Sequence, residues 1–291
     1  MSHDFQPEGQ GRTVVVIPTY DERDNIGAIV PAILEVAPGI EVWIVDDNSP
    51  DGTGDLADEM ASQTTLVRAF HRPRKAGLGT AYVESFRRAL AEEYCYVVEM
   101  DADFSHDPSA LPSLLKAARS ADLVIGSRYV PGGSTPDWTL TRRVISRVGN
   151  VVARIVLGVP IHDATTGYRV FNRRALATLR LDGISLRGYG FQIETVFQCH
   201  RAGLTIEEVP ICFIDRRQGH SKMSRAIVIE ALLYVFRRRL SEILRAPGGH
   251  KHGPSAVDLA LSHQPERVRD HNQPTECAGG DQQDIQPQAP S

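Results

Sequence analysis

Short apolar runs alternate with amphipathic stretches through the first half of the chain. The runs are rich in Val and Ile and are bounded by turn residues, so they predict strands at 13–17, 41–45, 65–70, 94–100 and 123–126. The stretches between them predict helices at 25–36, 55–62, 80–92 and 108–117. Such an alternation is typical of an α/β fold, in which helices cover both faces of a mostly parallel sheet.

Two prolines refine these helices. Asp107 followed by Pro108 is a favourable helix start, with a capping side chain before a proline at the first helical position. Pro31 lies inside the first predicted helix, where we expect a kink.

The second half of the chain is less regular. An amphipathic helix with a basic beginning is predicted at 140–157 and a further helix near 192–201, with strands at 166–171, 205–210 and 211–214. A long amphipathic helix is predicted at 224–244. From residue 246 onward the chain is rich in Gly, Pro, His and Gln, which predicts a disordered tail. We therefore expect a polar segment at 1–12, a folded domain at 13–223, an amphipathic helix at 224–245 and the tail at 246–291.

Composition adds few constraints. Charged residues make up 23% of the chain and the net charge is −4, which gives no reason to expect a nucleic-acid partner. The four cysteines have no metal-binding or redox spacing, which favours a reducing, cytosolic location. No N-terminal signal pattern is found, and no apolar run approaches the roughly 20 residues of a membrane-spanning helix. Any membrane contact is therefore expected to be peripheral.

Asp101 and Asp103 follow directly after an apolar run that reads as a strand. Because side chains alternate along a strand, the two carboxylates leave the same face. Ligands of α/β sheets bind at the carboxyl ends of the strands, and paired carboxylates suit a hard divalent ion that also binds diphosphate oxygens. An isolated pair of this kind is more often a solvated turn. The segments that follow the other predicted strands therefore decide between a turn and a binding site.

Three other polar segments also follow predicted strands, at 18–25, 45–53 and 126–129. A parallel sheet brings these segments and 100–106 to one edge, which predicts an acidic crevice beside Arg128. Carboxylates there can bind ribose hydroxyls or a metal, and an arginine can hold phosphate. Each segment alone also fits an ordinary turn, but four coincidences at strand ends favour a binding site.

These segments carry a family resemblance. The stretch from about Val14 to Phe236 resembles the GT-A glycosyltransferases of family 2, and among them the dolichol-phosphate (polyprenol-phosphate) mannose synthases. The matching stretches are P-T-Y-D-E-R-D-N-I, V-D-D-N-S-P-D-G-T, R-P-R-K-A-G-L-G-T-A-Y, M-D-A-D-F-S-H, G-S-R-Y, D-A-T-T-G-Y-R-V-F, G-Y-G-F-Q-I-E and D-R-R-Q-G-H-S-K-M-S. The resemblance implies a GT-A (Rossmann-like) fold followed by the amphipathic helix.

The resemblance also implies roles for individual residues. One group would bind the nucleotide part of GDP-mannose: Pro18, Tyr20, Glu22, Val45, Asp47, Met100 and Ala102. Asp101 and Asp103 would bind Mg²⁺ or Mn²⁺ with the diphosphate. The family often places a glutamine ligand where this chain has Ser105, whose shorter side chain weakens or relays that contact. Arg128, Arg216 and Lys222 would contact phosphates, and Asp163 falls where the family places an active-centre acid.

The implied reaction transfers mannose to dolichyl or polyprenyl phosphate with inversion. The lipid phosphate is already largely dianionic near neutral pH and needs little help from a general base. A metal would neutralise the departing diphosphate, and Arg216 and Lys222 would add positive charge. Gly219 between them suggests a mobile lid, although an ordinary basic loop is the alternative.

The helix predicted at 224–244 has an apolar face and an arginine triplet at 237–239. Such a helix fits an anionic membrane interface, and packing against the folded domain is an equally good interpretation. Together with the basic helix at 140–157 it predicts docking at the cytoplasmic face of a membrane.

Three other functions are compatible with parts of this pattern. A sibling enzyme could transfer glucose or another hexose, with a uridine donor. A non-catalytic nucleotide-sugar binding module has no need of Asp101, Asp103, Arg216 and Lys222 together. A nucleotidyltransferase would carry a glycine- and arginine-rich loop after the first strand, where this chain has Pro18-Thr19-Tyr20.

Overall fold

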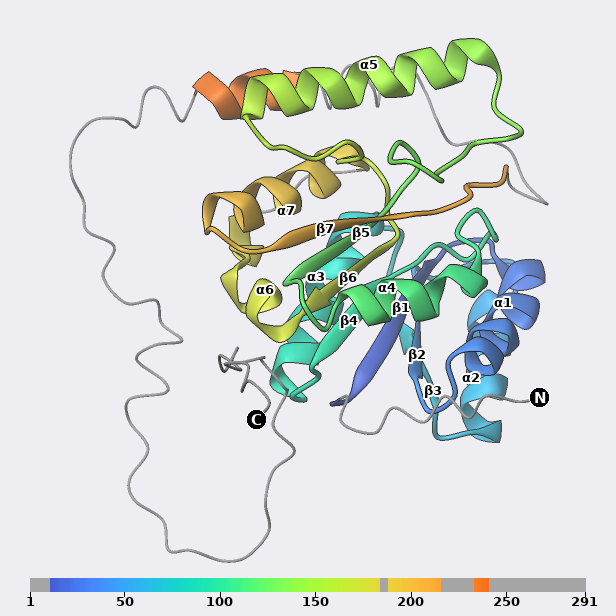
Figure 1. The fold of residues 1–291 in the computed structure, drawn as a ribbon. Coiled ribbons are helices and arrows are strands. Elements are labelled where there is room, and N and C mark those ends of the chain that lie inside the picture. Colours follow the sequence, from blue (N-terminus) through green and yellow to red (C-terminus); the bar gives the residue numbers. More distant parts are fainter. Residues whose placement is uncertain (1–10, 184–187, 216–232, 241–291) are drawn as a thin grey trace, which may run out of the picture.

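The computed structural model describes residues 11–183, 188–215 and 233–240. A seven-stranded sheet with the order β3-β2-β1-β4-β6-β5-β7 forms its centre (Figure 1). The strands are β1 (Thr13–Thr19), β2 (Glu41–Asp46), β3 (Val67–His71), β4 (Tyr96–Glu99), β5 (Leu123–Ser127), β6 (Arg169–Asn172) and β7 (Ile206–Pro210). All neighbouring pairs are parallel except those that β6 makes with β4 and β5. The predicted α/β class with a mostly parallel sheet is confirmed.

Helices cover both faces of this sheet. They are α1 (Arg23–Val36), α2 (Thr53–Gln63), α3 (Leu78–Ala91), α4 (Leu111–Ala117), α5 (Leu140–Leu157), α6 (Arg173–Thr178) and α7 (Tyr189–Arg201). Short 3-10 helices lie at Pro108–Ala110 and Leu181–Gly183. Residues 233–240 are helical as well. The Asp107 side chain caps the first of the 3-10 helices, as predicted, by accepting from the Ser109 N–H. The helix α1 continues through Pro31.

The alternation of side chains divides the core into two clusters. Val14 and Val16 of β1 face one cluster, to which α3, α6 and α7 contribute. Val15 and Ile17 of the same strand face the other, to which α1, α2 and α4 contribute. Because central strands are covered on both sides, they read as continuous apolar runs rather than as alternating ones.

Several predictions for the second half of the chain need correction. The segment 211–214 is not a strand, because Cys212 and Phe213 form only isolated bridges, with Ser134 and His106. The strand predicted at 166–171 begins at Arg169 and runs antiparallel, although the strand–helix alternation favoured parallel pairing. The helix α6 was not predicted, since its six residues are too few for a helical period to stand out.

The helix α5 has the predicted bounds but an unexpected orientation. Figure 1 shows it as a separate layer across the top of the molecule, above α7 and β7. It is capped by the Thr139 side chain and ends at Gly158, whose φ of 68° suits glycine. Its inward face buries Asn150, Ala153 and Leu157. The opposite face is apolar and exposed, and consists of Leu140, Val144, Val148, Val151 and Ile155.

Residues 233–240 pack against the domain through one side. Val235 is buried in the same cluster as Ala153 of α5. The Tyr234 O–H donates to Glu194 of α7, and Arg238 Nε lies 3.2 Å from the same carboxylate. The other side exposes Leu233, Phe236 and Leu240. The packing interpretation is confirmed for the described part of this helix. Contact with a membrane through its exposed apolar residues stays a prediction. The rest of the predicted helix and the tail lie outside the described residues.

Candidate active site

The loops after β1 and β2 are bound to each other at the carboxyl edge of the sheet. The Thr19 hydroxyl lies 3.0 Å from Asp46 Oδ1, and the Ser49 N–H donates to Asp46 Oδ2 at 2.9 Å. The Ser49 hydroxyl in turn accepts from the Asp21 N–H at 3.0 Å. Asp21 and Asn48 both have positive φ, at 56° and 59°. Left-handed non-glycine residues are uncommon and often mark functional loops.

Asp47 organises the loop that follows β3. Its Oδ1 accepts from Arg72 Nη1, and its Oδ2 accepts from the backbone N–H groups of Ala76 and Gly77 at 3.0 and 3.1 Å. The same loop places Lys75 Nζ 3.5 Å from the centre of the Tyr20 ring. The structure thus brings Tyr20 and Asp47, two predicted nucleotide-binding residues, to one loop. Arg72 and Lys75 were not singled out as site residues, although they lie in the matching stretch R-P-R-K-A-G.

The other predicted nucleotide-binding residues lie along the same strands. Pro18 and Val45 are register partners in the β1–β2 pair. Met100 and Ala102 are buried, and the Met100 N–H donates to the Val16 carbonyl at 3.2 Å. Glu22 begins α1 and accepts from the Asn25 side-chain amide at 2.7 Å. These positions bring the predicted group to the ends of β1, β2 and β4.

The turn after β4 carries the two predicted metal ligands. The Asp101 side chain is 33% exposed, whereas Asp103 is buried and its Oδ1 accepts from the Ser105 N–H at 3.0 Å. Phe104, between Asp103 and Ser105, has a φ of 60°, so the turn contains one residue in the left-handed conformation. The Ser105 hydroxyl is buried and has no hydrogen-bond partner among the described residues. A buried oxygen without a partner beside two carboxylates fits a hard divalent cation.

This site would need ligands from outside the chain. Among the described residues there is no group of three or more His, Cys, Asp or Glu side chains that could hold a metal alone. Mg²⁺ is commonly bound by one or two carboxylates together with water and substrate phosphates. Asp101, Asp103 and Ser105 therefore suit a metal that arrives with a diphosphate.

His106 supports the same turn from behind. Its buried ring accepts from the Asp101 N–H through Nδ1 at 3.1 Å, and it stacks on Tyr168 with 5.0 Å between ring centres. Burial lowers the pKa of His106, and the nearby Asp101 and Asp103 carboxylates only partly oppose this. A neutral ring is the form that accepts from the Asp101 N–H. The sequence alone assigns no role to His106 and misses its contact with the turn of Asp101 and Asp103, which its place directly after Ser105 could have suggested.

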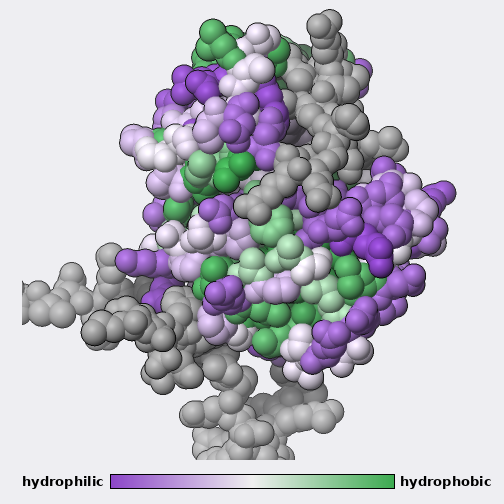
Figure 2. All heavy atoms as spheres, turned by 90° about the vertical axis from the view of Figure 1, so that its right-hand side faces the viewer, coloured by the Kyte–Doolittle hydropathy of each residue, from purple (hydrophilic) through white to green (hydrophobic). Residues whose placement is uncertain are grey.

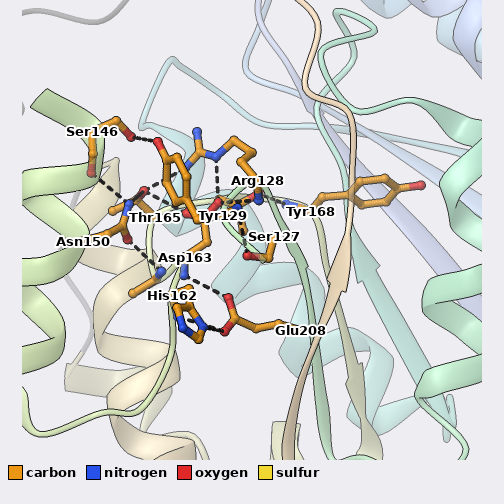
Figure 3. Close-up of polar contacts among 12 residues, drawn as sticks. Ser127, Arg128, Tyr129, Ser146, Asn150, His162, Asp163, Thr165, Tyr168 and Glu208 are labelled. Atoms are coloured by element: carbon orange, nitrogen blue, oxygen red, sulfur yellow. Dashed lines mark hydrogen bonds and ion pairs between the residues drawn. The ribbon is translucent and has the colours of Figure 1, made fainter. Parts of the chain in front are cut away.

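Arg128 and Asp163 form a buried ion pair at the end of β5. Asp163 Oδ2 accepts from Arg128 Nε at 2.7 Å and from its backbone N–H at 3.0 Å, while Oδ1 accepts from Nη2 at 2.7 Å (Figure 3). Burial by itself would raise the pKa of Asp163, but the charge and hydrogen bonds of Arg128 outweigh it and lower that pKa. The two residues are therefore charged at neutral pH.

Aromatic rings join this pair to the turn that carries Asp101 and Asp103. The Phe213 ring lies edge-on to His106, with 5.7 Å between ring centres, and its centre is 5.4 Å from the Arg128 guanidinium carbon. The backbone at Ser127 and Arg128 is also closely covered by Gly133, where a Cβ would lie 2.6 Å from the Ser127 carbonyl oxygen. The predicted residues on the β4 and β5 loops are thus brought together across β6. Arg216 and Lys222 lie outside the described residues.

Comparison with known proteins extends these findings. Residues 14–180 match the family described as glycosyl transferase family 2. The chain is 46% identical over 226 residues to an undecaprenyl-phosphate mannosyltransferase from Micrococcus luteus, covering 78% of this chain and 93% of the relative. It is also 46% identical over 226 residues to a polyprenol monophosphomannose synthase from Mycolicibacterium smegmatis, covering 77% and 85%.

The fold has solved counterparts as well. One is glucosyl-3-phosphoglycerate synthase from Mycobacterium tuberculosis in complex with Mn²⁺, UDP-glucose and phosphoglyceric acid. The TM-score is 0.58 at 21% identity, and the match covers 79% of this chain and 80% of the other. At this identity the likeness concerns the fold.

Proposed function

The chain belongs to glycosyl transferase family 2, and on that premise we propose that it transfers mannose from GDP-mannose to polyprenyl phosphate with inversion. Two relatives that are 46% identical over most of both chains carry names that describe this class of reaction, and this observation carries the proposal. The guanosine donor is proposed from the resemblance of the segments that contain Pro18, Tyr20 and Asp47.

A divalent metal is proposed at the turn after β4. Asp101 and Asp103 would hold it through their carboxylates, and the buried Ser105 hydroxyl supplies a further oxygen. When bound, Mg²⁺ or Mn²⁺ would supply positive charge that stabilises the departing diphosphate. His106 contributes by holding the backbone at Asp101, which keeps the first carboxylate at the mouth of the crevice.

The proposed chemistry needs little proton transfer. The second pKa of a phosphate monoester is about 6, so the acceptor is mainly dianionic near pH 7 and can attack the sugar carbon directly. Direct attack inverts the configuration at that carbon, from an α-linked donor to a β-linked product. Asp163 is not needed as a general base in this scheme. Both of its oxygens already accept from Arg128. Arg128, with Arg216 and Lys222, would balance the negative charge of donor and acceptor.

A prenyl phosphate resides in a bilayer, so we also propose peripheral contact with the membrane. None of the described helices combines the length and apolar character needed to cross a membrane. The outward face of α5 instead exposes a stripe of large apolar side chains, with Arg147 and Arg154 exposed beside it. Figure 2 shows hydrophobic side chains at the upper end of the molecule, at the level that α5 occupies in Figure 1. Apolar residues beside arginines are typical of helices that lie in an anionic interface.

Transfer of label into lipid tests the proposal. Purified protein is incubated with polyprenyl phosphate, Mg²⁺ or Mn²⁺ and one of several radiolabelled nucleotide sugars, and label in the organic phase is counted. We expect label from GDP-mannose, and product analysis should give the β-linked sugar. Label from UDP-glucose in its place would assign the enzyme to the hexosyltransferase alternative. Donor binding without any transfer would support the non-catalytic module.

A further inference from the structure

Much of the Arg128 guanidinium is engaged by the protein itself. Nε and Nη2 donate to Asp163, and Nη2 also lies 2.9 Å from the Thr165 hydroxyl. Among the described residues none bonds to Nη1. The arginine therefore cannot offer its full planar fork to a phosphate, and the edge that carries Nη1 is the part left for a ligand.

Asp163 acts on a ligand only through this arginine. Its side chain is fully buried, and each of its oxygens accepts from Arg128. A carboxylate held in this way is poorly placed to accept a proton from a substrate. We therefore regard Asp163 as a positioning residue that fixes the angle and depth of the Arg128 guanidinium.

The turn that contains Asp163 is itself held from two sides (Figure 3). On one side Glu208 of β7 accepts from the Asp163 N–H at 2.9 Å and from the His162 N–H at 2.8 Å. On the other side Asn150 of α5 accepts from the Ala164 N–H at 2.8 Å. The Asn150 amide also donates to the Thr165 hydroxyl, at 3.1 Å.

These contacts hold the turn in place at both ends. Glu208 is the register partner of Ile125 in β5, and Ile125 lies three residues before Arg128. The pairing of β7 with β5 therefore places Glu208 near the strand end from which Arg128 extends. The Glu208 side chain is 8% exposed, and it spans two consecutive backbone N–H groups. Asn150 is 2% exposed and faces inward from α5. Both residues are therefore built into the fold around the turn.

We infer that Glu208 and Asn150 are positioning residues for the reaction: they hold the turn of residues 162–165, and with it Asp163 and the Arg128 guanidinium, in place for the donor diphosphate. This inference rests on the proposed function, in which Arg128 faces the diphosphate. Neither residue is among those that the family resemblance assigns to the site.

A double-mutant cycle tests the inference. Glu208→Gln keeps the shape of the side chain but exchanges one acceptor oxygen for an NH₂ group, so one of the two backbone N–H groups loses its partner. The loss of a hydrogen bond to a charged acceptor corresponds to about a tenfold loss of kcat/KM. In the Arg128→Lys background the same substitution should cost less than about twofold, because the fork that Glu208 helps to hold is gone. Glu207→Gln, an exposed neighbour on the same strand, should change neither background.

Asn150→Ala provides a second cycle if Glu208→Gln unfolds. It removes the contacts with Ala164 and Thr165 from the α5 side and should couple to Arg128→Lys in the same way. Thermal unfolding of each variant separates a loss of folded protein from a loss of positioning. If the effects of Glu208→Gln and Arg128→Lys multiply independently, or if Glu208→Gln has no effect on folded protein, the inference is wrong.

Nucleotide affinity separates this inference from the proposed function. The same cycle is measured by calorimetry with GDP and UDP in the presence of Mn²⁺. If wild type transfers no mannose but the cycle shows coupling in nucleotide affinity, the proposed function fails and the inference survives. If transfer occurs and neither kcat/KM nor affinity shows coupling, the inference fails alone. If wild type neither transfers nor binds either nucleotide, both fail.

Discussion

Asp101 and Asp103 show how one strand end supplies two different carboxylates. Asp101 is partly exposed, whereas Asp103 is buried and its carboxylate accepts from the Ser105 N–H. An exposed ligand can exchange water for a substrate oxygen, while a fixed ligand keeps its position. In the proposed metal site the two carboxylates would therefore have different tasks.

The first prediction concerns this pair. Asp103→Asn should reduce transfer by at least about a hundredfold, since stabilisation of charge in the transition state is typically worth several kcal/mol. The variant should stay folded, and excess chelator should reduce transfer by the wild-type protein to the same degree. Transfer and thermal unfolding are measured on the same preparations. Full activity of wild type in chelator would exclude a metal role for these carboxylates.

Glu99 is a buried acid at the end of β4, directly before the turn that carries Asp101 and Asp103. Both of its oxygens are buried, and the Gln192 amide and the Arg169 guanidinium are among the polar groups that act on them. Burial raises the pKa of Glu99 to about 7, and the nearby charge of Arg169 does not offset this effect. The folded protein therefore holds a proton at Glu99 over a range of pH in which the unfolded chain has released it.

The second prediction follows from this raised pKa. The contribution of Glu99 to the free energy of unfolding is greatest below its unfolded pKa of 4.5 and is lost as pH rises toward about 7. Glu99→Gln should remove this dependence and stabilise the protein at pH 8 by about 3 kcal/mol, because each pKa unit corresponds to about 1.4 kcal/mol. Denaturant unfolding of both proteins between pH 5 and pH 8, without divalent metal, measures the effect. Parallel curves would show that folding does not raise the pKa of Glu99.

At the scale of elements, α5 differs most from a standard surface helix. Its buried side carries Asn150, Ala153 and Leu157, and its apolar stripe faces outward. A soluble helix normally places its apolar stripe toward the core. The reversed arrangement indicates a second apolar environment, which we propose to be the lipid that contains the acceptor.

The third prediction tests this outward stripe. Val148→Ser combined with Ile155→Ser should leave thermal stability nearly unchanged, because both side chains are exposed. Binding to anionic vesicles should weaken by about 3 kcal/mol, since burial of each apolar side chain is worth roughly 1.5 to 3 kcal/mol. Vesicle sedimentation and thermal unfolding measure the two effects. Unchanged vesicle binding would mean that α5 does not enter the lipid.

The elements show where sequence reasoning succeeds. The bounds of α5 and most strands of the first half follow from periodicity and turn residues, which are local signals. The segment 211–214 has the composition of a strand, but Ile211 packs beside Gly126 and its neighbours form only isolated bridges. The antiparallel direction of β6 depends on its partners β4 and β5, which no local pattern encodes.

The site divides in the same way. Asp101 and Asp103 lie two residues apart at a strand end, so the sequence reveals their pairing. Arg128 and Asp163 are separated by 35 residues, and their ion pair exists only because β6 folds back beside β5. Glu208 comes from a third element and contacts the backbone of His162 and Asp163 as well as the His162 ring, and these contacts leave no local motif in the sequence.

At the scale of the whole molecule, charge limits how the protein can meet a membrane. The net charge of the chain is −4, so an anionic surface repels it as a whole. Electrostatic attraction to such a surface must therefore come from a local group of basic side chains. Arg142 is not available for this purpose, because its Nη1 lies 2.6 Å from Asp215 and its guanidinium stacks on Trp138. Arg147 and Arg154 on α5 remain exposed.

The three arginines at 237–239 also differ in whether they are paired within the protein or exposed. Arg238 points inward, where it lies 3.2 Å from Glu194 and 4.6 Å from the centre of the Phe197 ring. Arg237 and Arg239 are exposed on the helix that also presents Leu233, Phe236 and Leu240. Reversal of all three charges would therefore disturb the fold together with the surface. Only Arg237 and Arg239 test lipid contact cleanly.

The fourth prediction uses this distinction. Arg237→Glu combined with Arg239→Glu should weaken binding to anionic vesicles by about 2 kcal/mol or more, because each basic residue near such a surface contributes about 1 kcal/mol. Transfer to a short, water-soluble prenyl phosphate should stay near the wild-type rate, since both arginines are exposed and neither belongs to the proposed site. Wild-type binding should also fall as salt rises, because exposed charges are screened over about 10 Å at 0.1 M.

A matched variant controls for net charge. Lys116→Glu combined with Arg180→Glu makes the same change in total charge on exposed residues outside α5 and residues 233–240. If the surface formed by α5 and residues 233–240 meets the lipid, this control should keep most of the vesicle binding that the first variant loses. Equal losses in both variants would show that binding responds only to total charge. Undiminished binding by the first variant would place the lipid contact on another face, and the acceptor phosphate would then have to reach the carboxyl ends of β1, β4 and β5 from that side.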